Sequence, residues 1–132
     1  MTAQGLVQAG EPGSAIISAI SGRAQGSAEV TVIAPVQSIS AGGLHTCGVM
    51  AAGAAYCWGW GGLGQLGNGS TTFHDTPVAV SGGLTFASIA AGRTFTCGVT
   101  TSGAAYCWGV GGNGQLGNGS TAGQTTPVAV ST

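Results

Sequence analysis

Residues 36–82 read VQSISAGGLHTCGVMAAGAAYCWGWGGLGQLGNGSTTFHDTPVAVSG, and residues 86–132 read FASIAAGRTFTCGVTTSGAAYCWGVGGNGQLGNGSTAGQTTPVAVST. The two stretches align without a gap and are identical at 31 of 47 positions. Identity at this level makes them two copies of one structural unit. Repeats of this length are typical of solenoids, propellers and other arrays, in which each unit buries its apolar face against its neighbours.

Each copy predicts four short antiparallel strands. Glycine, with 27 residues in the chain, disfavours helix by about 1 kcal/mol per position relative to alanine. Four strands in about 50 residues match the size of one propeller blade. We therefore expect an all-β fold with two four-stranded antiparallel blades of an incomplete β-propeller, preceded by a β-hairpin. The expected strands are 36–41, 45–50, 54–59 and 76–81, then 86–91, 95–100, 104–109 and 126–131.

The loop between the second and third strands fixes the register of the cysteines. Gly53, like its counterpart in the second copy, ends a three-residue loop in which a left-handed residue forms a β-bulge. This register places Cys47 opposite Cys57, and Cys97 opposite Cys107. Opposed β-carbons lie about 4.5–5.5 Å apart, which suits a disulfide. Neither pair has the Cys-x-x-Cys spacing that zinc sites prefer, so one disulfide per blade is the favoured interpretation, with zinc as the alternative.

Several motifs resemble the regulator of chromosome condensation repeat. They are ISAGGLHT at 39–46, YCWG at 56–59 and 106–109, GQLGNG at 64–69 and 114–119, and Thr-Pro at 76–77 and 126–127. Phe95 replaces the histidine of the motif, and Cys47 and Cys97 replace a residue that is usually aliphatic. Because paired cysteines are frequent in the bacterial secreted branch of the family, the copies resemble that branch most.

The resemblance implies a seven-bladed β-propeller, of which this chain supplies two blades, since seven need about 350 residues at this period. We expect a fragment of a longer protein, because the sequence stops where a third copy would begin, or alternatively several chains that assemble into a ring. Family members bind proteins, including a small GTPase in eukaryotes and β-lactamases in one bacterial branch. No residue here matches a known contact set, so the expected role is protein binding or display by a secreted or cell-surface bacterial protein.

The first 35 residues do not match the repeat. Residues 15–20 and 28–33 predict two strands around a turn-prone segment at 21–27. This resembles the last hairpin of a bacterial Ig-like domain followed by a linker, and a hairpin that caps the first blade is the alternative. The first residues do not have the pattern of a signal peptide, so we expect a secreted form of the protein to carry its signal upstream of this sequence. The expected domains are 1–35 (Ig-like remnant and linker), 36–85 (first propeller repeat) and 86–132 (second propeller repeat).

Charge is nearly absent, with two basic residues, three acidic residues and a net charge of −1. This composition lacks the basic surface that nucleic acids or anionic membranes require, and no apolar run approaches the roughly 18 residues of a membrane span. Glycines at 59–64 and 109–114 have the spacing of a dinucleotide loop, but no helix-forming sequence follows them. Three carboxylates are few for an enzyme, so we expect no catalysis and no cofactor.

The copies differ most where recognition is expected. Residues 72–75 differ from 122–125 at every position, and Trp60 has Val110 as its counterpart. Variable loops on a rigid scaffold commonly carry recognition, and an exposed tryptophan anchors protein partners. The candidate binding residues are Trp60, Thr72, Phe73, His74 and Asp75.

Two alternatives to protein binding remain open at this point. Trp60 and Tyr56, with polar loop residues, could bind a carbohydrate by stacking on a sugar ring. An enzyme whose site lies in other blades is the second alternative. His45 and His74 have no histidine counterpart in the second copy, so we expect neither to bind a metal or act in catalysis.

Overall fold

The chain folds into strands and tight turns in a computed structural model that describes residues 13–21, 24–32 and 35–132. It divides after Pro35 into two units, residues 1–35 and 36–132. The described ranges contain no helix, and therefore none that could cross a membrane. The expected all-β class is confirmed.

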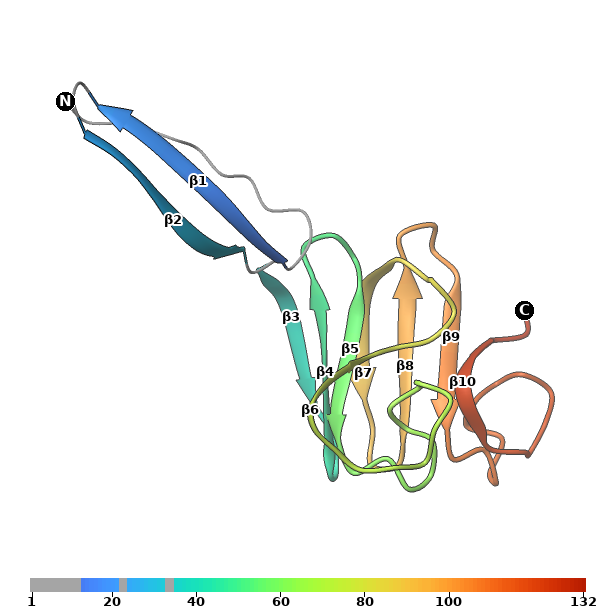
Figure 1. The fold of residues 1–132 in the computed structure, drawn as a ribbon. Coiled ribbons are helices and arrows are strands. Elements are labelled where there is room, and N and C mark those ends of the chain that lie inside the picture. The colour runs from blue at the N-terminus through green and yellow to red at the C-terminus, as the bar shows by residue number, and fades with distance from the viewer. Residues whose placement is uncertain (1–12, 22–23, 33–34) are drawn as a thin grey trace. The chain divides into compact units, whose positions relative to one another are not determined.

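Two four-stranded antiparallel sheets make up the second unit (Figure 1). In each sheet the strands lie in chain order, so every strand pairs with the next one along the sequence. We call the sheets blade 1 and blade 2. Blade 1 contains β3 (Val36–Ala41), β4 (His45–Met50), β5 (Ala55–Gly59) and β6 (His74–Ala79). Blade 2 contains β7 (Phe86–Ala91), β8 (Phe95–Thr100), β9 (Ala105–Gly109) and β10 (Gln124–Ala129).

The fourth strand of each blade begins two residues earlier than the sequence predicts. In blade 1, Cys57 lies opposite Val78 but Gly59 lies opposite His74, so the pairing shifts between these points. Pro77 falls within the shift, and proline has no N–H to donate to the ladder. The Thr-Pro pair therefore marks an irregularity inside the strand and not its start. The third strands begin one residue later than expected, at Ala55 and Ala105.

Residues 1–35 contribute one antiparallel hairpin, β1 (Gly13–Ser21) and β2 (Ala24–Val32). Both strands are longer than predicted, and Ser21 pairs with Ala24, so the expected turn at 21–27 is wrong. Residues 24–27 are extended because cross-strand pairing overrides the turn preference of glycine and serine. The last residue of the strand expected at 28–33 lies outside the described residues.

The turn between β4 and β5 fixes the cysteine pairing. Gly53 has φ +90°, and its N–H donates to the Met50 carbonyl at 2.8 Å. Cys47 therefore lies directly opposite Cys57, and a disulfide joins them with a Cα–Cα distance of 4.1 Å. Cys97 and Cys107 form the equivalent disulfide in blade 2. All four cysteines are paired, which confirms the disulfide interpretation and excludes a zinc site made of these thiols.

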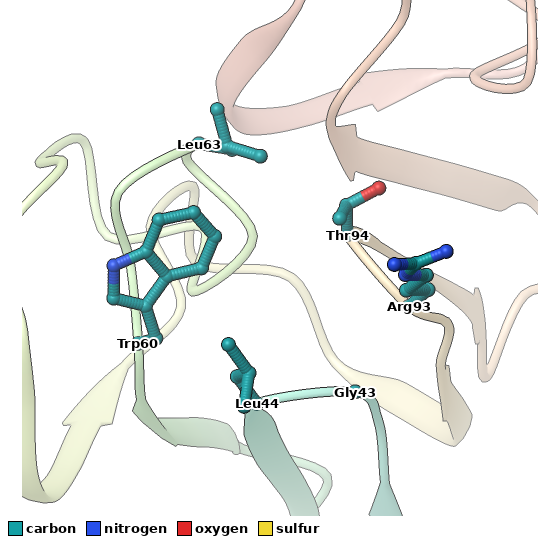
Figure 2. A pocket seen from close by; sticks show the side chains of 6 residues that line it. All are labelled: Gly43, Leu44, Trp60, Leu63, Arg93 and Thr94. Atoms are coloured by element: carbon teal, nitrogen blue, oxygen red, sulfur yellow. The ribbon is translucent and has the colours of Figure 1, made fainter.

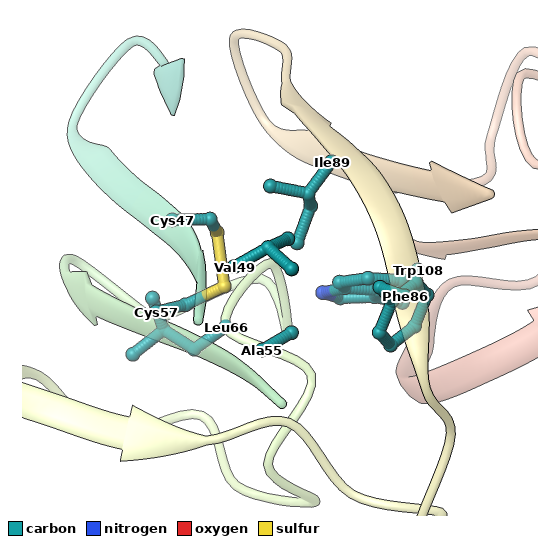
Figure 3. Close-up of a cluster of buried hydrophobic side chains, with 8 residues drawn as sticks. All are labelled: Cys47, Val49, Ala55, Cys57, Leu66, Phe86, Ile89 and Trp108. Atoms are coloured by element: carbon teal, nitrogen blue, oxygen red, sulfur yellow. A yellow bond between two sulfur atoms is a disulfide. The ribbon is translucent and has the colours of Figure 1, made fainter. Parts of the chain in front are cut away.

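The core lies between the blades (Figure 3). Because side chains alternate along a strand, each blade has two faces. The leading face of blade 1 carries Cys47, Val49, Ala55 and Cys57, and their counterparts in blade 2 are Cys97, Val99, Ala105 and Cys107. The trailing face of blade 2 carries Phe86, Ile89, Thr96 and Trp108, and their counterparts in blade 1 are Val36, Ile39, Thr46 and Trp58. The leading face of blade 1 packs against the trailing face of blade 2.

A glycine-rich loop after β5 joins the two blades. The carbonyl of Gln65 accepts hydrogen bonds from the Thr96 hydroxyl at 2.8 Å and from the Trp108 indole N–H at 3.0 Å. Gly67 lies against the same indole ring with φ +71°, and a Cβ there would stand 2.5 Å from the indole nitrogen. The loop of blade 1 is therefore part of the blade 1–blade 2 interface, and glycine is required at position 67.

Candidate functional site

Two turns from neighbouring blades meet near one end of the sheets. The turn at 42–44 connects β3 to β4, and the turn at 92–94 connects β7 to β8. The N–H of Gly43 donates to the Gly92 carbonyl at 3.2 Å, which joins the two turns. The N–H of Trp60 donates to the Leu44 carbonyl at 2.9 Å and holds the segment after β5 beside the first turn. The relative positions of these segments thus depend on the packing of the blades.

These segments surround an open hollow of about 440 Å³ (Figure 2). Three apolar side chains line it although water reaches each of them: Leu44 is 69% exposed, Leu63 is 42% exposed and Trp60 is 39% exposed. Figure 2 shows the Trp60 ring between Leu44 and Leu63, with the second-blade turn on the opposite side. The complete lining is Gly43, Leu44, Trp60, Leu63, Arg93 and Thr94.

The apolar residues of the hollow are not required by the blade architecture. At the same positions of blade 2, Leu44 is replaced by Thr94, Trp60 by Val110 and Leu63 by Asn113. The surrounding motifs are identical in the two copies, so the second copy builds the same loops with smaller or polar side chains. A cluster of exposed large apolar side chains on an otherwise repeated scaffold is typical of a binding surface.

The hollow has one charged group. Arg93 lines it, and Asp75 is the only other charged side chain between residues 36 and 132. Asp75 is not part of the lining. A guanidinium binds carboxylates with a bidentate geometry and also lies favourably over aromatic rings. The hollow therefore combines an apolar floor with a group that attracts an anion.

A cluster of polar side chains lies between the blades, outside the hollow. His45 is buried, and its Nε2 lies 2.8 Å from the Thr96 hydroxyl. The Thr96 hydroxyl donates its single proton to the Gln65 carbonyl, so Nε2 of His45 must be the donor in the hydrogen bond to Thr96. The Nδ1 atom is buried and has no hydrogen-bond partner. Burial lowers the pKa of His45 below 6.5, so the folded protein favours the neutral imidazole.

We expect the free energy of unfolding to decrease as pH falls below 6.5, the ordinary pKa of histidine. Above this value the neutral form is present in both states, so the stability is fully retained. Below it the unfolded chain binds a proton more readily than the folded chain, so protonation favours unfolding. Urea denaturation between about pH 8 and pH 5 measures the effect.

The matched variant is His45→Phe, because Phe95 stands at this position of blade 2. It should lose most of the pH dependence, whereas His74→Gln should retain it. A His45→Phe protein with the unchanged pH dependence of the wild type would show that another group is responsible.

The sequence motifs and the fold agree with one repeat family. A model of the Regulator of chromosome condensation (RCC1) repeat matches residues 52–99 and 102–132, and a second model of the same repeat matches residues 36–65 and 86–115. The chain belongs to the RCC1 repeat family. No individual curated protein matches it significantly.

Several solved structures share the fold of these blades. Yeast RCC1 (Prp20) bound to Kap60 superposes with a TM-score of 0.70 at 21% identity, over 82% of this chain and 27% of that chain. Human WBSCR16 superposes with a TM-score of 0.69 at 22% identity, over 80% of this chain and 28% of that chain. Prp20p from Saccharomyces cerevisiae, described with its binding to Gsp1p and histones, superposes with a TM-score of 0.67 at 23% identity. The match covers 83% of this chain and 29% of that chain. This chain thus spans less than a third of the length of each.

The RCC1 blades place the predicted binding residues in two different surroundings. Trp60 lines the hollow, whereas Thr72, Phe73, His74 and Asp75 do not. The Nε2 atom of His74 accepts a hydrogen bond from the side-chain amide of Asn68 at 3.3 Å and lies 3.0 Å from the Thr72 hydroxyl, so His74 orders its own loop. Phe73 is exposed on that loop. Tyr56, proposed with Trp60 for sugar binding, is half-buried on β5 and does not line the hollow either.

Sequence reasoning missed several residues of the site. Leu44, Leu63 and Arg93 line the hollow, and Gln65 positions the blades around it. The first three could have been found, because each differs from its counterpart in the other copy as Trp60 does. Gln65 gives no such signal since Gln115 repeats it. Within residues 35–132 and the two described stretches before them, no group of three His, Cys, Asp or Glu side chains is placed to hold a metal.

Proposed function

We propose that this RCC1-repeat chain is a non-enzymatic binding module and that the hollow between its blades binds a protein partner. The observation that carries the proposal is the cluster of exposed Leu44, Trp60 and Leu63 around one cavity. Aromatic anchors in concave, partly desolvated surfaces dominate protein binding energies. Structures that share the fold support the partner class, because yeast Prp20 is described with Kap60, Gsp1p and histones.

The lining indicates the chemistry of the partner. The apolar side chains suit a large apolar residue, and Arg93 suits a carboxylate beside it. We therefore propose a peptide segment that carries an aliphatic or aromatic residue next to Asp or Glu. The small number of charges on residues 36–132 leaves Arg93 as the main electrostatic feature of this surface.

The wider setting is also proposed. Two disulfides are typical of an oxidising compartment, which supports a secreted or cell-surface protein. In this proposal the chain belongs to a longer bacterial protein, whose remaining blades complete a propeller. Residues 1–35 are the end of an Ig-like domain with its linker, and residues 36–85 and 86–132 are successive propeller repeats.

A random peptide library displayed on phage tests the proposal on the immobilised 132-residue chain. Enriched peptides should pair a large apolar residue with Asp or Glu. Trp60→Ala should weaken their binding about tenfold or more, and Arg93→Gln should weaken only the peptides that carry the acidic residue. Val110→Ala, the equivalent change in blade 2, is the matched control and should leave binding unchanged.

Two results would contradict the protein-binding proposal. One is a selection in which no enriched peptide depends on Trp60. The other is binding to a glycan array that disappears in Trp60→Ala while no peptide is enriched, which would favour a carbohydrate ligand instead.

A further inference from the structure

Each of the three segments around the hollow continues directly into a buried polar residue of the interface between the blades. We call these three polar residues the buried network, and each of them is at most 3% exposed. They follow residues that line the hollow by one or two positions: His45 follows Leu44, Gln65 follows Leu63, and Thr96 follows Thr94. A displacement within the buried network therefore also displaces the lining of the hollow.

One hydroxyl group connects the buried network. The Thr96 hydroxyl accepts a hydrogen bond from Nε2 of His45 at 2.8 Å and donates one to the Gln65 carbonyl at 2.8 Å. The side chain of Gln65 reaches the lining itself, because its Oε1 accepts a hydrogen bond from the N–H of Leu63 at 2.9 Å. The network thus holds one strand of each blade and the loop after β5 in fixed relative positions around the hollow.

The other ring nitrogen of His45 lies at the contact between the two turns that border the hollow. A Cβ placed on Gly42 would stand 2.9 Å from Nδ1 of His45, and it would also clash with the carbonyl oxygen of Gly92. Nδ1 and this oxygen therefore lie on the same side of Gly42. The oxygen already accepts the N–H of Gly43 at 3.2 Å, which is the hydrogen bond that joins the turns. Nδ1 is buried without a hydrogen-bond partner among the described residues.

A proton on Nδ1 changes this contact. The neutral ring presents Nδ1 as an acceptor, whereas the imidazolium presents an N–H that needs an acceptor of its own. The new N–H has to compete with Gly43 for the Gly92 carbonyl or be reached by water, and either outcome weakens the hydrogen bond between the turns. A buried charge without a partner is also much less stable than a neutral group. The protonated ring therefore favours a more open arrangement of the two turns.

The charged and titratable groups near His45 do not compensate for this proton. Between residues 36 and 132, the turn at 92–94 contributes Arg93, whose charge has the same sign, and β5 contributes Tyr56. The neighbouring strands β3, β7 and β8 and the loop at 60–67 contribute none. The one carboxylate, Asp75, is exposed and lies with His74 on β6, which β5 separates from β4. Burial accordingly lowers the pKa of His45 below 6.5.

We propose that protonation of His45 opens the contact between the two turns and releases a bound partner from the hollow. This regulation rests on the binding function proposed above. Because the bound form favours the neutral ring, the affinity is fully present above the pKa of His45 in the free protein and falls as the pH drops through that pKa. Linkage to a single proton limits the loss to about tenfold per pH unit.

Peptide binding between about pH 8 and pH 5 tests the regulation on the full 132-residue chain with intact disulfides. The probe is an enriched library peptide without histidine, whose carboxylate stays ionised in this range. The dissociation constant of the wild type should rise several-fold on acidification. His45→Gln should bind as the wild type does at pH 8 and keep that affinity at pH 5, since the amide can donate to Thr96 but does not titrate. His74→Gln is the matched control and should retain the pH dependence of the wild type.

Amide hydrogen exchange without peptide measures the opening itself. In the wild type, the protection factor of the Gly43 N–H should decrease several-fold as the His45 ring becomes protonated, with the same midpoint in an NMR titration. The Gly53 N–H, which donates to Met50 in the turn between β4 and β5, should keep its protection, whereas global unfolding would expose both amides. His45→Gln should show no change at Gly43.

The two measurements separate this inference from the proposed function. Protection of Gly43 that does not follow the titration of His45 would overturn the inference, and so would an affinity that is equal at both pH values or falls equally in His45→Gln. A library that yields no peptide dependent on Trp60 would contradict the proposed function, and the exchange at Gly43 would still decide whether His45 controls the contact between the turns.

Discussion

Replacing Trp108 with alanine is expected to lower the free energy of unfolding by about 3–5 kcal/mol, the range for a large aromatic residue removed from a core. The side chain is fully buried, and its ring lies 5.8 Å from that of Phe86 between centroids. Its indole N–H is one of the two side-chain donors to the Gln65 carbonyl. The substitution therefore removes apolar contact, creates a cavity and weakens the link between the blades.

Trp58→Ala is the control, because Trp58 has the same place in blade 1 but is half-buried. It should cost about 1 kcal/mol, since a side chain already in contact with water loses less on truncation. Urea denaturation measures both free energies of unfolding. Equal costs for the two substitutions would contradict the placement of Trp108 in the interface between the blades.

Removing the disulfide of blade 1 with Cys47→Ala and Cys57→Ala should lower the free energy of unfolding by about 4 kcal/mol. Closing a loop of this size accounts for about 3 kcal/mol in the chain-entropy model, and truncation of two buried side chains adds about 1 kcal/mol. Cys47 and Cys57 are fully buried in the core between the blades.

The disulfide of blade 2 gives the comparison, because its cysteines have the same sequence separation of 10 residues. The loop-closure contribution is therefore equal, but Cys97 is only partly buried. Cys97→Ala with Cys107→Ala should cost about 3 kcal/mol by the same model. Thermal or urea unfolding distinguishes the pairs, and a larger loss in blade 2 would show that the burial of the two blades is assigned wrongly.

Sequence patterns were sufficient to predict features that depend on neighbouring strands. The opposition of Cys47 and Cys57 follows from the loop that ends at Gly53, because a hairpin turn sets the register for the whole strand pair. The start of β6 at His74 could not be read in this way. The irregular pairing between Gly59 and Cys57 absorbs two residues, and the local preference of Thr76 and Pro77 gives no sign of it.

Features that depend on the packing of one blade on the other were harder to predict. Trp60 was identified because it differs from its counterpart Val110. Arg93, which lines the same hollow, belongs to the other blade and stands 33 positions later in the chain, so only the packing of the blades brings the two together. The different burial of Trp58 and Trp108 likewise cannot be predicted from the sequence, since YCWG is identical in both copies. Only the order of the blades decides which tryptophan the loop with Gln65 covers.

The central claim is that the copies pack as consecutive blades, with the loop of blade 1 bound to Trp108 of blade 2. Hydrogen exchange of the three indole N–H protons, followed by NMR, tests it most directly. We predict that the Trp108 proton exchanges far more slowly than those of Trp58 and Trp60, because it alone among them donates to a buried carbonyl. Three protons that exchange at similar rates, or slowest exchange at Trp58 or Trp60, would contradict this arrangement.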